Sequence, residues 1–377
     1  MKSHNYLDKI KITIVITLCL LNFQLSGFAQ FKNLTKDSIY SNLLQEKRDL
    51  IIYLPTDLVE KKDSGMHYPV LYVLDGSSHY LSLSGMIHEL AETSRTYTLP
   101  KMIVVFVNNT KRTRDLTPYP IQKSDYVSEE MAKETGGAET FTKSIEEEIF
   151  PYIASKYPVT NYRALIGHSF GGIFALNILA KHKHMFDDYI VIDPSTWYDN
   201  RKFANGVIDS LSKNDYKGKT LFLTIANTTN QTDTNRVKNS TATFSEHEKS
   251  ILAFNKKVKA IKNNLVYTSK YYPNDNHSSV PIISIYDGIR FLFKDIRFNI
   301  DEIIEPGYNP KKDISAYFNK VSKKIQYNIK PSSSFLEICD SRYGSRKDEK
   351  NRAALRAFYM ELYPQKAAAY LNKLNQK

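Results

Sequence analysis

Residues 162–181 read YRALIGHSFGGIFALNILAK, and they hold the most informative motif of the chain. The apolar run 162–166 is typical of a buried strand, and residues 172–181 favour a helix. Between the two lies GHSFG at residues 167–171, a G-x-S-x-G sequence in the strand–turn–helix context that presents a nucleophilic serine. A tight turn needs neighbours without bulk, which the glycines supply. The stretch therefore predicts that Ser169 stands at the end of a buried strand, where its hydroxyl can act as a nucleophile.

Strand-like runs alternate with helix-compatible stretches from residue 48 to about residue 293. The strand-like runs are Arg48–Leu54, Val70–Leu74, Met102–Val107, Ala164–Ile166, Tyr189–Ile192 and Leu221–Ile225. Short apolar runs of this kind are typical of strands that are buried on both faces of a sheet. The alternation predicts an α/β fold with a mainly parallel sheet, helices on both faces and ligands at the carboxyl ends of the strands.

The C-terminal part of the chain has a different pattern. Residues 301–312 contain two prolines and a glycine, so we expect a boundary there between a main domain, 30–300, and a C-terminal helical region, 301–377. Apolar residues at helical spacing predict three or four short helices, which form a small appendage without chemistry of its own. This region carries 15 Lys or Arg against nine Asp or Glu, but its aromatic residues lie on the apolar stripes, so nucleic-acid binding is not expected.

The N-terminus has the pattern of an export signal. Three lysines precede the apolar stretch Ile12–Phe23, which is short for a membrane span, and Gly27 and Ala29 suit a signal peptidase that cuts after Ala29. We therefore expect residues 1–29 to be removed and the mature protein to be periplasmic or secreted and not membrane-spanning; an uncleaved anchor is the alternative. Cys339 is then the single cysteine, which excludes an intrachain disulfide.

A serine nucleophile needs a base, and His277 fits the chain order expected for one. It lies in a polar loop after the predicted strand 265–272 and before the predicted helix 280–293. His182 and His184 have no third ligand at usable spacing, so neither a metal nor another cofactor is predicted.

The acid that would orient this base is less well determined. It should follow the run 221–225, where the first carboxylate is Asp233, so Asp233 is the predicted acid. Asp275 and Asp193 are alternatives, and a Ser–His dyad oriented by a neutral group is a further one. His247 lies within a predicted helix and is not a candidate base.

Five blocks along the chain carry a family resemblance. They are Tyr68–Gly76 (YPVLYVLDG), Arg112–Pro118 (RTRDLTP), Gly136–Glu139 (GGAE), Gly167–Gly172 (GHSFGG) and His277–Pro281 (HSSVP). In this order they resemble the "putative esterase" branch of the α/β-hydrolases, a group that includes enterochelin, salmochelin and feruloyl esterases. The resemblance spans roughly residues 35–295, and the tail is similar to the tetratricopeptide-like helices that follow this domain in some relatives.

The resemblance implies an α/β-hydrolase fold and a set of roles for residues. Ser169 would be the nucleophile and His277 the base. The oxyanion hole would consist of the N–H groups of Phe170 and of Gly76, which follows a strand end. Two further residues would bind substrate: Arg114 in the loop that borders the cleft, and Trp197 in a segment that lines the pocket.

These observations predict an exported serine hydrolase that cleaves a carboxylic ester through an acyl-enzyme. The substrate would be a small-molecule, glycan or siderophore ester. An acyltransferase that moves the acyl group to a carbohydrate hydroxyl is the alternative, because the same acyl-enzyme forms and only the acceptor differs. A non-catalytic binding protein is a weaker alternative, since it would have little use for both Ser169 and His277.

Overall fold

The computed structural model describes residues 31–60, 65–93, 96–124, 126–229 and 245–376. The predicted export signal, residues 1–29, and the predicted acid, Asp233, lie outside the described residues. No helix among the described residues combines the length and the apolar character needed to cross a membrane.

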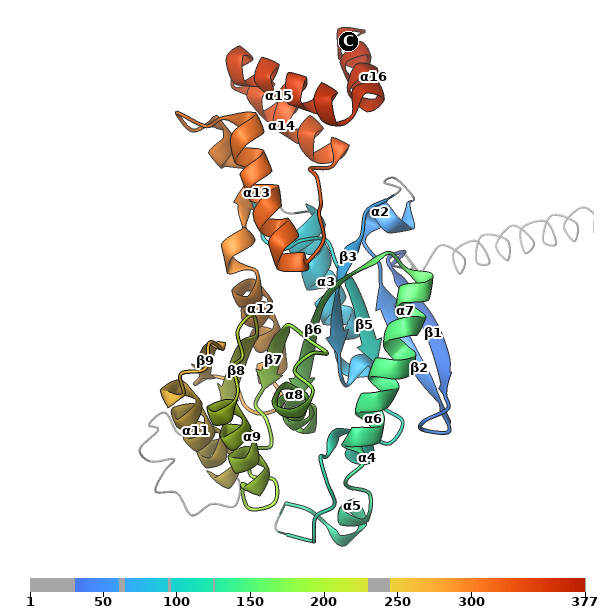
Figure 1. The fold of residues 1–377 in the computed structure, drawn as a ribbon, viewed down its shortest axis with the longest axis vertical. Helices are drawn as coiled ribbons and strands as arrows, with labels where there is room; N and C mark the ends of the chain where they lie inside the picture. The colour runs from blue at the N-terminus through green and yellow to red at the C-terminus, as the bar shows by residue number, and fades with distance from the viewer. Residues whose placement is uncertain (1–30, 61–64, 94–95, 125, 230–244, 377) are drawn as a thin grey trace, which may run out of the picture.

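An eight-stranded sheet forms the centre of the described part of the chain (Figure 1). Its strands, in spatial order, are β1 (Leu34–Ser41), β2 (Glu46–Tyr53), β5 (Ile103–Val107), β3 (Tyr68–Val73), β6 (Val159–His168), β7 (Asp188–Ile192), β8 (Thr220–Ala226) and β9 (Val266–Tyr272). The pairs β1–β2 and β2–β5 are antiparallel and all other neighbours are parallel. The predicted mainly parallel sheet is therefore confirmed. Every residue of β3, β5, β7 and β8 is buried, which explains their nearly continuous apolar sequences.

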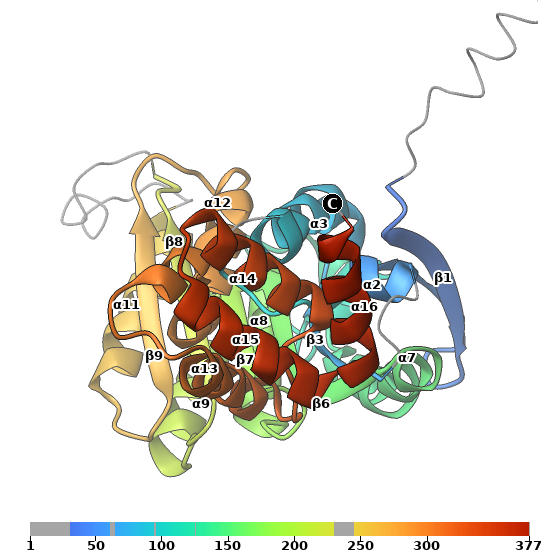
Figure 2. The ribbon, with the colours of Figure 1, turned by 90° about the horizontal axis from the view of Figure 1, so that it is seen from above.

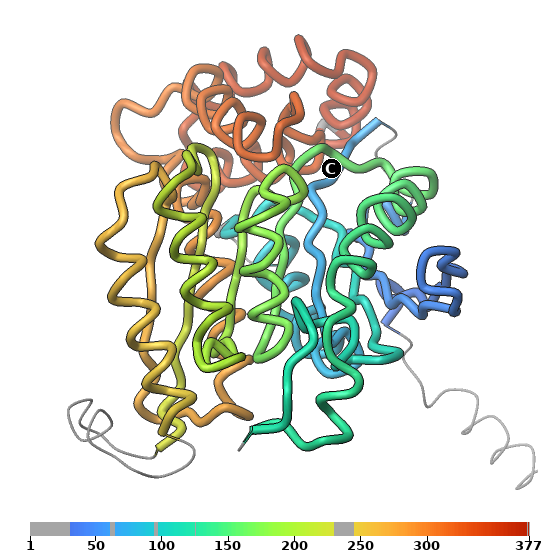
Figure 3. Tube along the Cα trace, turned by 60° about the horizontal axis from the view of Figure 1, so that its bottom comes forward, coloured from blue at the N-terminus to red at the C-terminus, as the bar shows by residue number. Residues whose placement is uncertain are grey.

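Helices cover both faces of the sheet, as predicted. One face packs against α6 (Ala138–Ser144), η2 (Ile145–Ile149), α7 (Phe150–Lys156), α8 (Phe170–Lys181), α9 (Lys202–Lys213) and α11 (Ser245–Ala260). The other face packs against α3 (Gly76–His88), η1 (Glu89–Thr93) and α12 (Val280–Leu292). Figure 3 shows the first group, coloured green to yellow, side by side across the sheet.

Shorter elements connect these layers and lead to the C-terminal region. They are α2 (Thr56–Val59), α4 (Arg112–Leu116), α5 (Glu129–Lys133), η3 (Lys294–Ile296), η4 (Ile300–Ile304) and a small two-stranded sheet of β4 (Thr96–Tyr97) and β10 (Phe298–Asn299). The elements α4 and α5 lie at the end of the molecule opposite the C-terminal helices (Figure 1).

The C-terminal region consists of α13 (Pro310–Ile325), α14 (Ser333–Ser345), α15 (Glu349–Leu362) and α16 (Pro364–Asn375). Helices α14–α16 form a separate small core with η4 and β10, and they spread over one end of the main domain (Figure 2). Helix α13 contributes to this small core and to the core of the sheet. Ile314 packs with α14 and α15, while Val321 and Ile325 belong to the apolar cluster on the face of the sheet that α3 and α12 cover. The region is thus a docked helical unit, and α13 joins it to the main domain.

Helix α13 docks at the edge where the parallel strands begin. Lys324 forms an ion pair with Asp188, the first residue of β7, and Tyr162 Oη donates to the same carboxylate at 2.5 Å. Ser169 follows the last residue of β6, so it lies at the opposite edge of the sheet. The C-terminal helices and the candidate nucleophile therefore occupy opposite ends of the strands.

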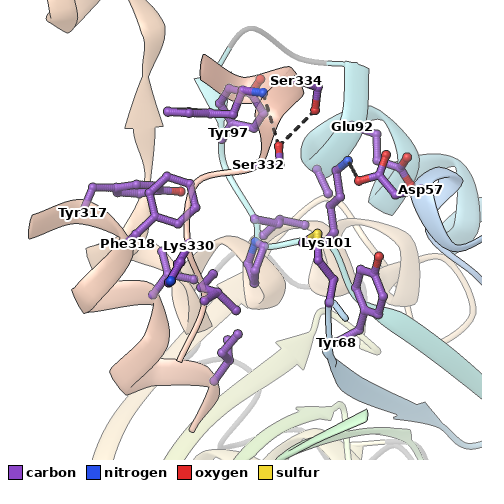
Figure 4. A pocket seen from close by; sticks show the side chains of 18 of the residues that line it. Asp57, Tyr68, Glu92, Tyr97, Lys101, Tyr317, Phe318, Lys330, Ser332 and Ser334 are labelled. Atoms are coloured by element: carbon purple, nitrogen blue, oxygen red, sulfur yellow. Dashed lines mark hydrogen bonds and ion pairs between the residues drawn. The ribbon is translucent and has the colours of Figure 1, made fainter. Parts of the chain in front are cut away.

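An apolar pocket of about 270 Å³ lies where these helices meet the main domain (Figure 4). Its lining includes Tyr68 at the start of β3, Leu99, Phe318 and Ile325, while Lys101 pairs with Asp57 at one side. The pocket is at the edge of the sheet remote from Ser169, so it is separate from the site described next.

Candidate active site

Ser169 occupies a strained turn between β6 and α8. Its backbone has φ 58° and ψ −114°, outside the regions that a residue with a side chain ordinarily adopts. A Cβ at Gly167 would lie 2.1 Å from the carbonyl oxygen of Gly171, and one at Gly172 would lie 2.8 Å from Pro194 Cβ. Side chains at these positions would therefore force the turn open, which is why glycines surround the serine.

Hydrogen bonds fasten this turn to the end of β7. The Ser169 N–H donates to the carbonyl of Ile192 at 3.0 Å, and the Ser195 N–H donates to the carbonyl of Ser169 at 3.2 Å. Ser169 Oγ lies 3.2 Å from Ser195 Oγ. The segment that follows β7 is thus held directly against the candidate nucleophile.

Asp193 lies in that segment and accepts hydrogen bonds from two histidines. His277 Nδ1 is 2.6 Å and His247 Nε2 is 2.9 Å from Asp193 Oδ2, while the Ala226 N–H donates to Oδ1 at 2.8 Å. The Asp193 side chain is 0% exposed, whereas that of His277 is 34% exposed. A carboxylate can only accept, so each imidazole donates an N–H hydrogen bond to it. Because Nδ1 of His277 carries the proton, Nε2 of the neutral ring is left as an acceptor.

The charge of Asp193 is stabilised by these donors. Burial alone would raise the pKa of the carboxyl group, but the hydrogen bonds and charges of His247 and His277 outweigh it and hold the pKa below its ordinary range. Asp193 is therefore ionised at neutral pH and can orient a histidine and stabilise its protonated form.

A third histidine, His168, also packs against the ring of His277. The ring centroids of His168 and His277 are 4.4 Å apart, and those of His247 and His277 are 4.8 Å apart. Burial, and next the charge of His277, lower the pKa of His168 to about 3. His168 is therefore neutral at physiological pH and confines the His277 ring without a competing charge.

The two N–H groups predicted for an oxyanion hole stand at the starts of two helices. Phe170 is the first residue of α8, and Gly76 is the first residue of α3. The first N–H groups of a helix have no intrahelical acceptor and favour an anion. A Cβ at Gly171 would lie 3.4 Å from Asp75 Oδ2, so the two helix starts are neighbours, and a Cβ at Gly76 would clash with Phe106 at 2.7 Å.

Arg112, rather than Arg114, contacts the serine turn. Its guanidinium makes a bidentate pair with Asp75 at 2.6 and 3.0 Å, and it donates to the carbonyl of His168 at 3.4 Å. Arg114 instead pairs with Glu46 and Asp115, each at 2.7 Å. Arg114 is thus engaged by two carboxylates, and the structure brings its neighbour Arg112 to the candidate site.

Trp197 lies beside the same cluster. Its ring stacks on Tyr126 at a centroid distance of 4.7 Å and lies 6.1 Å from Phe170. Its Nε1–H donates to His247 Nδ1 at 3.0 Å. Trp197 therefore forms part of the wall next to the serine turn, and it also holds the second histidine.

Most of the residues singled out from the sequence converge here. Ser169, Phe170, His277 and Trp197 are joined through the contacts above to Asp193, which was one of the alternatives for the acid. The other alternative, Asp275, lies in a turn where its Oδ1 accepts from Ser279 Oγ at 2.8 Å.

His247 was missed as a member of the site. A signal was nevertheless present, because positions 247, 251, 254 and 258 share one face of α11 and all are buried. A histidine that extends an apolar stripe toward a strand end is a candidate for a polar contact inside the protein.

Two curated relatives of this chain are named as siderophore esterases. The siderophore enterobactin esterase of Emericella nidulans is 31% identical over 152 residues, which cover 37% of this chain and 50% of that protein. The ferri-bacillibactin esterase BesA of Bacillus subtilis is 32% identical over 139 residues, covering 34% of this chain and 48% of that protein. The chain thus spans about half the length of these curated relatives.

A solved structure covers more of the chain. The IroE-like serine hydrolase of Shewanella oneidensis matches with a TM-score of 0.73 at 29% identity, covering 87% of this chain and 99% of that one. This likeness confirms the α/β-hydrolase fold. The likeness of the tail to tetratricopeptide-like helices stays a prediction. The family model described as "Putative esterase" matches residues 41–279, more than half of the sequence, and the chain therefore belongs to this esterase family.

Proposed function

We propose that this protein is an exported serine hydrolase that cleaves a carboxylic ester through an acyl-enzyme on Ser169. The observation that carries the proposal is the 2.6 Å hydrogen bond from His277 to buried, ionised Asp193, next to a serine in a strained strand-to-helix turn. A nucleophile, a base and a carboxylate that orients the base are the parts that acyl transfer by serine requires.

In the first half of the reaction, Ser169 Oγ attacks the ester carbonyl while His277 Nε2 removes the hydroxyl proton. The hydroxyl rotates for this from its contact with Ser195 Oγ at 3.2 Å, since such hydrogen bonds tighten only when substrate is bound. The oxyanion that forms accepts from the N–H groups of Phe170 and Gly76. His277 then protonates the leaving alcohol, and the acyl group remains on Ser169.

In the second half, water replaces the alcohol. His277 removes a proton from the water, the hydroxide attacks the acyl-enzyme, and the proton returns to Ser169 as the acid leaves. Asp193 keeps the Nδ1 proton of His277 in place throughout and stabilises the imidazolium, without taking that proton itself.

We propose a siderophore ester as the substrate class. Two relatives are named as esterases of enterobactin and of ferri-bacillibactin, and the family model that matches this chain spans residues 41–279, which include Ser169 and His277. Export from the cytoplasm, predicted from residues 1–29, would place the enzyme where iron-chelating esters are met outside the cell.

A turnover screen of the purified protein tests this function. The panel contains enterobactin, triacetylfusarinine C, a feruloyl ester, and acetyl and medium-chain p-nitrophenyl esters, with the Ser169→Ala variant as the control for each. We expect kcat/KM to be highest for a siderophore ester and to vanish in the variant. Highest turnover of a feruloyl or acetyl ester would retain the esterase and reject the substrate class, and equal rates in both proteins would reject the esterase.

A further inference from the structure

Asp193 accepts hydrogen bonds from two imidazoles, and the reaction proposed above uses only one of them. His247 Nε2 contacts the same carboxylate oxygen, Oδ2, that accepts from His277 Nδ1. His247 is buried in the first turn of α11, on an element that contributes no other residue to the reaction. Its contact with Asp193 therefore calls for a separate explanation.

The tautomer of His247 is set by Trp197. The indole Nε1–H is a donor only, so His247 Nδ1 accepts from it and the proton of the neutral ring must be on Nε2. That proton is the one donated to Asp193. The chain of donors runs from Trp197 through His247 to Asp193.

The contact distances are those of direct hydrogen bonds. Asp193, His247 and His277 offer ligand atoms within 4.8 Å of one another, a set that could in principle hold a metal ion. Ligand atoms around a tetrahedral zinc, each at about 2.0–2.1 Å from it, lie roughly 3.3 Å apart. The two contacts to Oδ2 measure 2.6 and 2.9 Å, which are hydrogen-bond distances and shorter than this tetrahedral spacing.

We propose that His247 is a positioning residue, which fixes the Asp193 carboxylate for His277 and is itself held in the donating tautomer by Trp197. The proposal rests on the function proposed above. Without His247, Oδ2 would have a buried lone pair without a donor, and the carboxylate could rotate away from His277. His247 and His277 donate to the same oxygen, Oδ2. The hydrogen bond from His247 therefore weakens the stabilisation that the negative charge of Oδ2 gives to a protonated His277.

Other charged or titratable groups lie around this cluster and stay unchanged in the variants below. They are His168 at the end of β6, Asp75 just before α3, His79 in the first turn of α3, Arg112, Glu248 on α11 and Tyr271 on β9. A change in pH dependence that follows substitution of His247 alone can therefore be assigned to that ring.

The test compares two substitutions of His247 in the full chain. His247→Gln retains an N–H donor near the position of Nε2, whereas His247→Phe retains a ring and removes both nitrogens. The control is His184→Gln, a surface histidine that pairs with Glu146. The rate constant for labelling of Ser169 by a fluorophosphonate is measured from pH 5 to 9, together with kcat and KM for a short ester.

We expect His247→Phe to lower the labelling rate constant and kcat by roughly tenfold to a hundredfold, less than the ~10⁴ caused by losing a triad acid, with little change in KM. The midpoint of its pH profile should move to higher pH by about half a unit or more. Without the hydrogen bond from His247, the charge on Oδ2 stabilises a protonated His277 more strongly. His247→Gln should stay within about threefold of the wild type, since an amide N–H is still donated.

Two results would overturn the proposal: equal losses in the Phe and Gln variants, which indicate packing, or wild-type profiles in both. Should the Phe variant not fold, Trp197→Phe decides, because it keeps an aromatic side chain and removes the N–H that donates to His247. A pH profile superimposable on the wild type would then refute the proposal, and a displaced one would support it. Absence of label on Ser169 in the wild-type protein is a distinct result, which rejects the proposed function itself.

Discussion

Asp188 and Asp193 are buried carboxylates at the two ends of a single strand. Asp188 begins β7 and is bound by Lys324 of α13, whereas Asp193 directly follows the strand and is bound by His277. Five residues of extended chain span roughly 17 Å. The strand therefore connects the docking point of the C-terminal helices with the carboxylate of the candidate site, while it keeps the two contacts well apart.

Removal of the C-terminal helices should affect stability much more than chemistry. A protein that ends at Asp313 loses Lys324 and uncovers the apolar residues that Val321 and Ile325 contact, so it should be less soluble and less stable. Turnover of a short ester per titrated active site should stay within about tenfold of the full chain, because the docking edge is remote from Ser169. A hundredfold loss per titrated site would show that these helices shape the cleft.

A single substitution isolates the docking contact. Lys324→Met should lower the free energy of unfolding by about 3 kcal/mol, because it leaves the Asp188 carboxylate buried without its cation. Lys323→Met, an exposed position on the same helix, is the matched control and should change it by less than about 0.5 kcal/mol. Urea unfolding of the three proteins measures the difference; equal values for both variants would mean that the pair contributes nothing.

Ser169→Ala should abolish covalent chemistry. We expect kcat to fall by roughly 10⁴–10⁶, as when a triad serine is removed, with no fluorophosphonate label on the variant. Intact-protein mass spectrometry detects the label, and Ser212→Ala, an exposed serine on α9, serves as the control. A labelled Ala variant would identify a different nucleophile.

Substitutions can identify the base and decide between two candidate acids, Asp193 and Asp233. The structure does not describe Asp233. His277→Ala should abolish turnover, and Asp193→Asn should lower kcat by up to about 10⁴, because the amide no longer stabilises the imidazolium. Asp233→Asn should change kcat less than about tenfold, as should Asp209→Asn, an exposed control. The opposite order of effects for Asp193 and Asp233 would assign the acid to Asp233.

Local sequence patterns were sufficient for the fold and for part of the site. The turn at Ser169 could be predicted because its geometry depends on glycines within a few residues. Asp193 could not be preferred over other carboxylates, because its partner His277 is 84 residues away and no local pattern records that contact. The docking of α13 depends likewise on a contact between Lys324 and Asp188, 136 residues apart. Helical spacing predicted the helix and not where it would pack.

Chelation of metal ions should leave the activity unchanged. The contacts of His247 and His277 to Asp193 are hydrogen-bond distances, and the proposed reaction needs no Lewis acid. After dialysis against EDTA we expect kcat for a short ester within about twofold of the untreated protein, a change smaller than 1 kcal/mol in barrier. Elemental analysis of both samples identifies any bound metal, and activity that is lost with the metal and restored by zinc would contradict this expectation.

The buried imidazole of His168 should make the fold less stable in acid. Its pKa is lowered from 6.5 to about 3, first by burial and next by the charge of His277. Between these two values the unfolded chain holds more protons at this position than the folded protein. The free energy of unfolding therefore falls as the pH drops from about 6.5 toward 3, by at most about 1.4 kcal/mol per pH unit from this group.

His168→Phe should remove this contribution, because phenylalanine keeps a ring against His277 and has no group to protonate. It also replaces Nε2, a buried atom for which the described residues provide no hydrogen-bond partner, so stability at pH 7 should be equal or higher. Urea unfolding at pH 7, 6 and 5 measures the slope. We expect the free energy of unfolding to decline less steeply in the variant than in the wild type, whereas parallel declines would mean that His168 gains its proton in the folded protein as readily as in the unfolded chain.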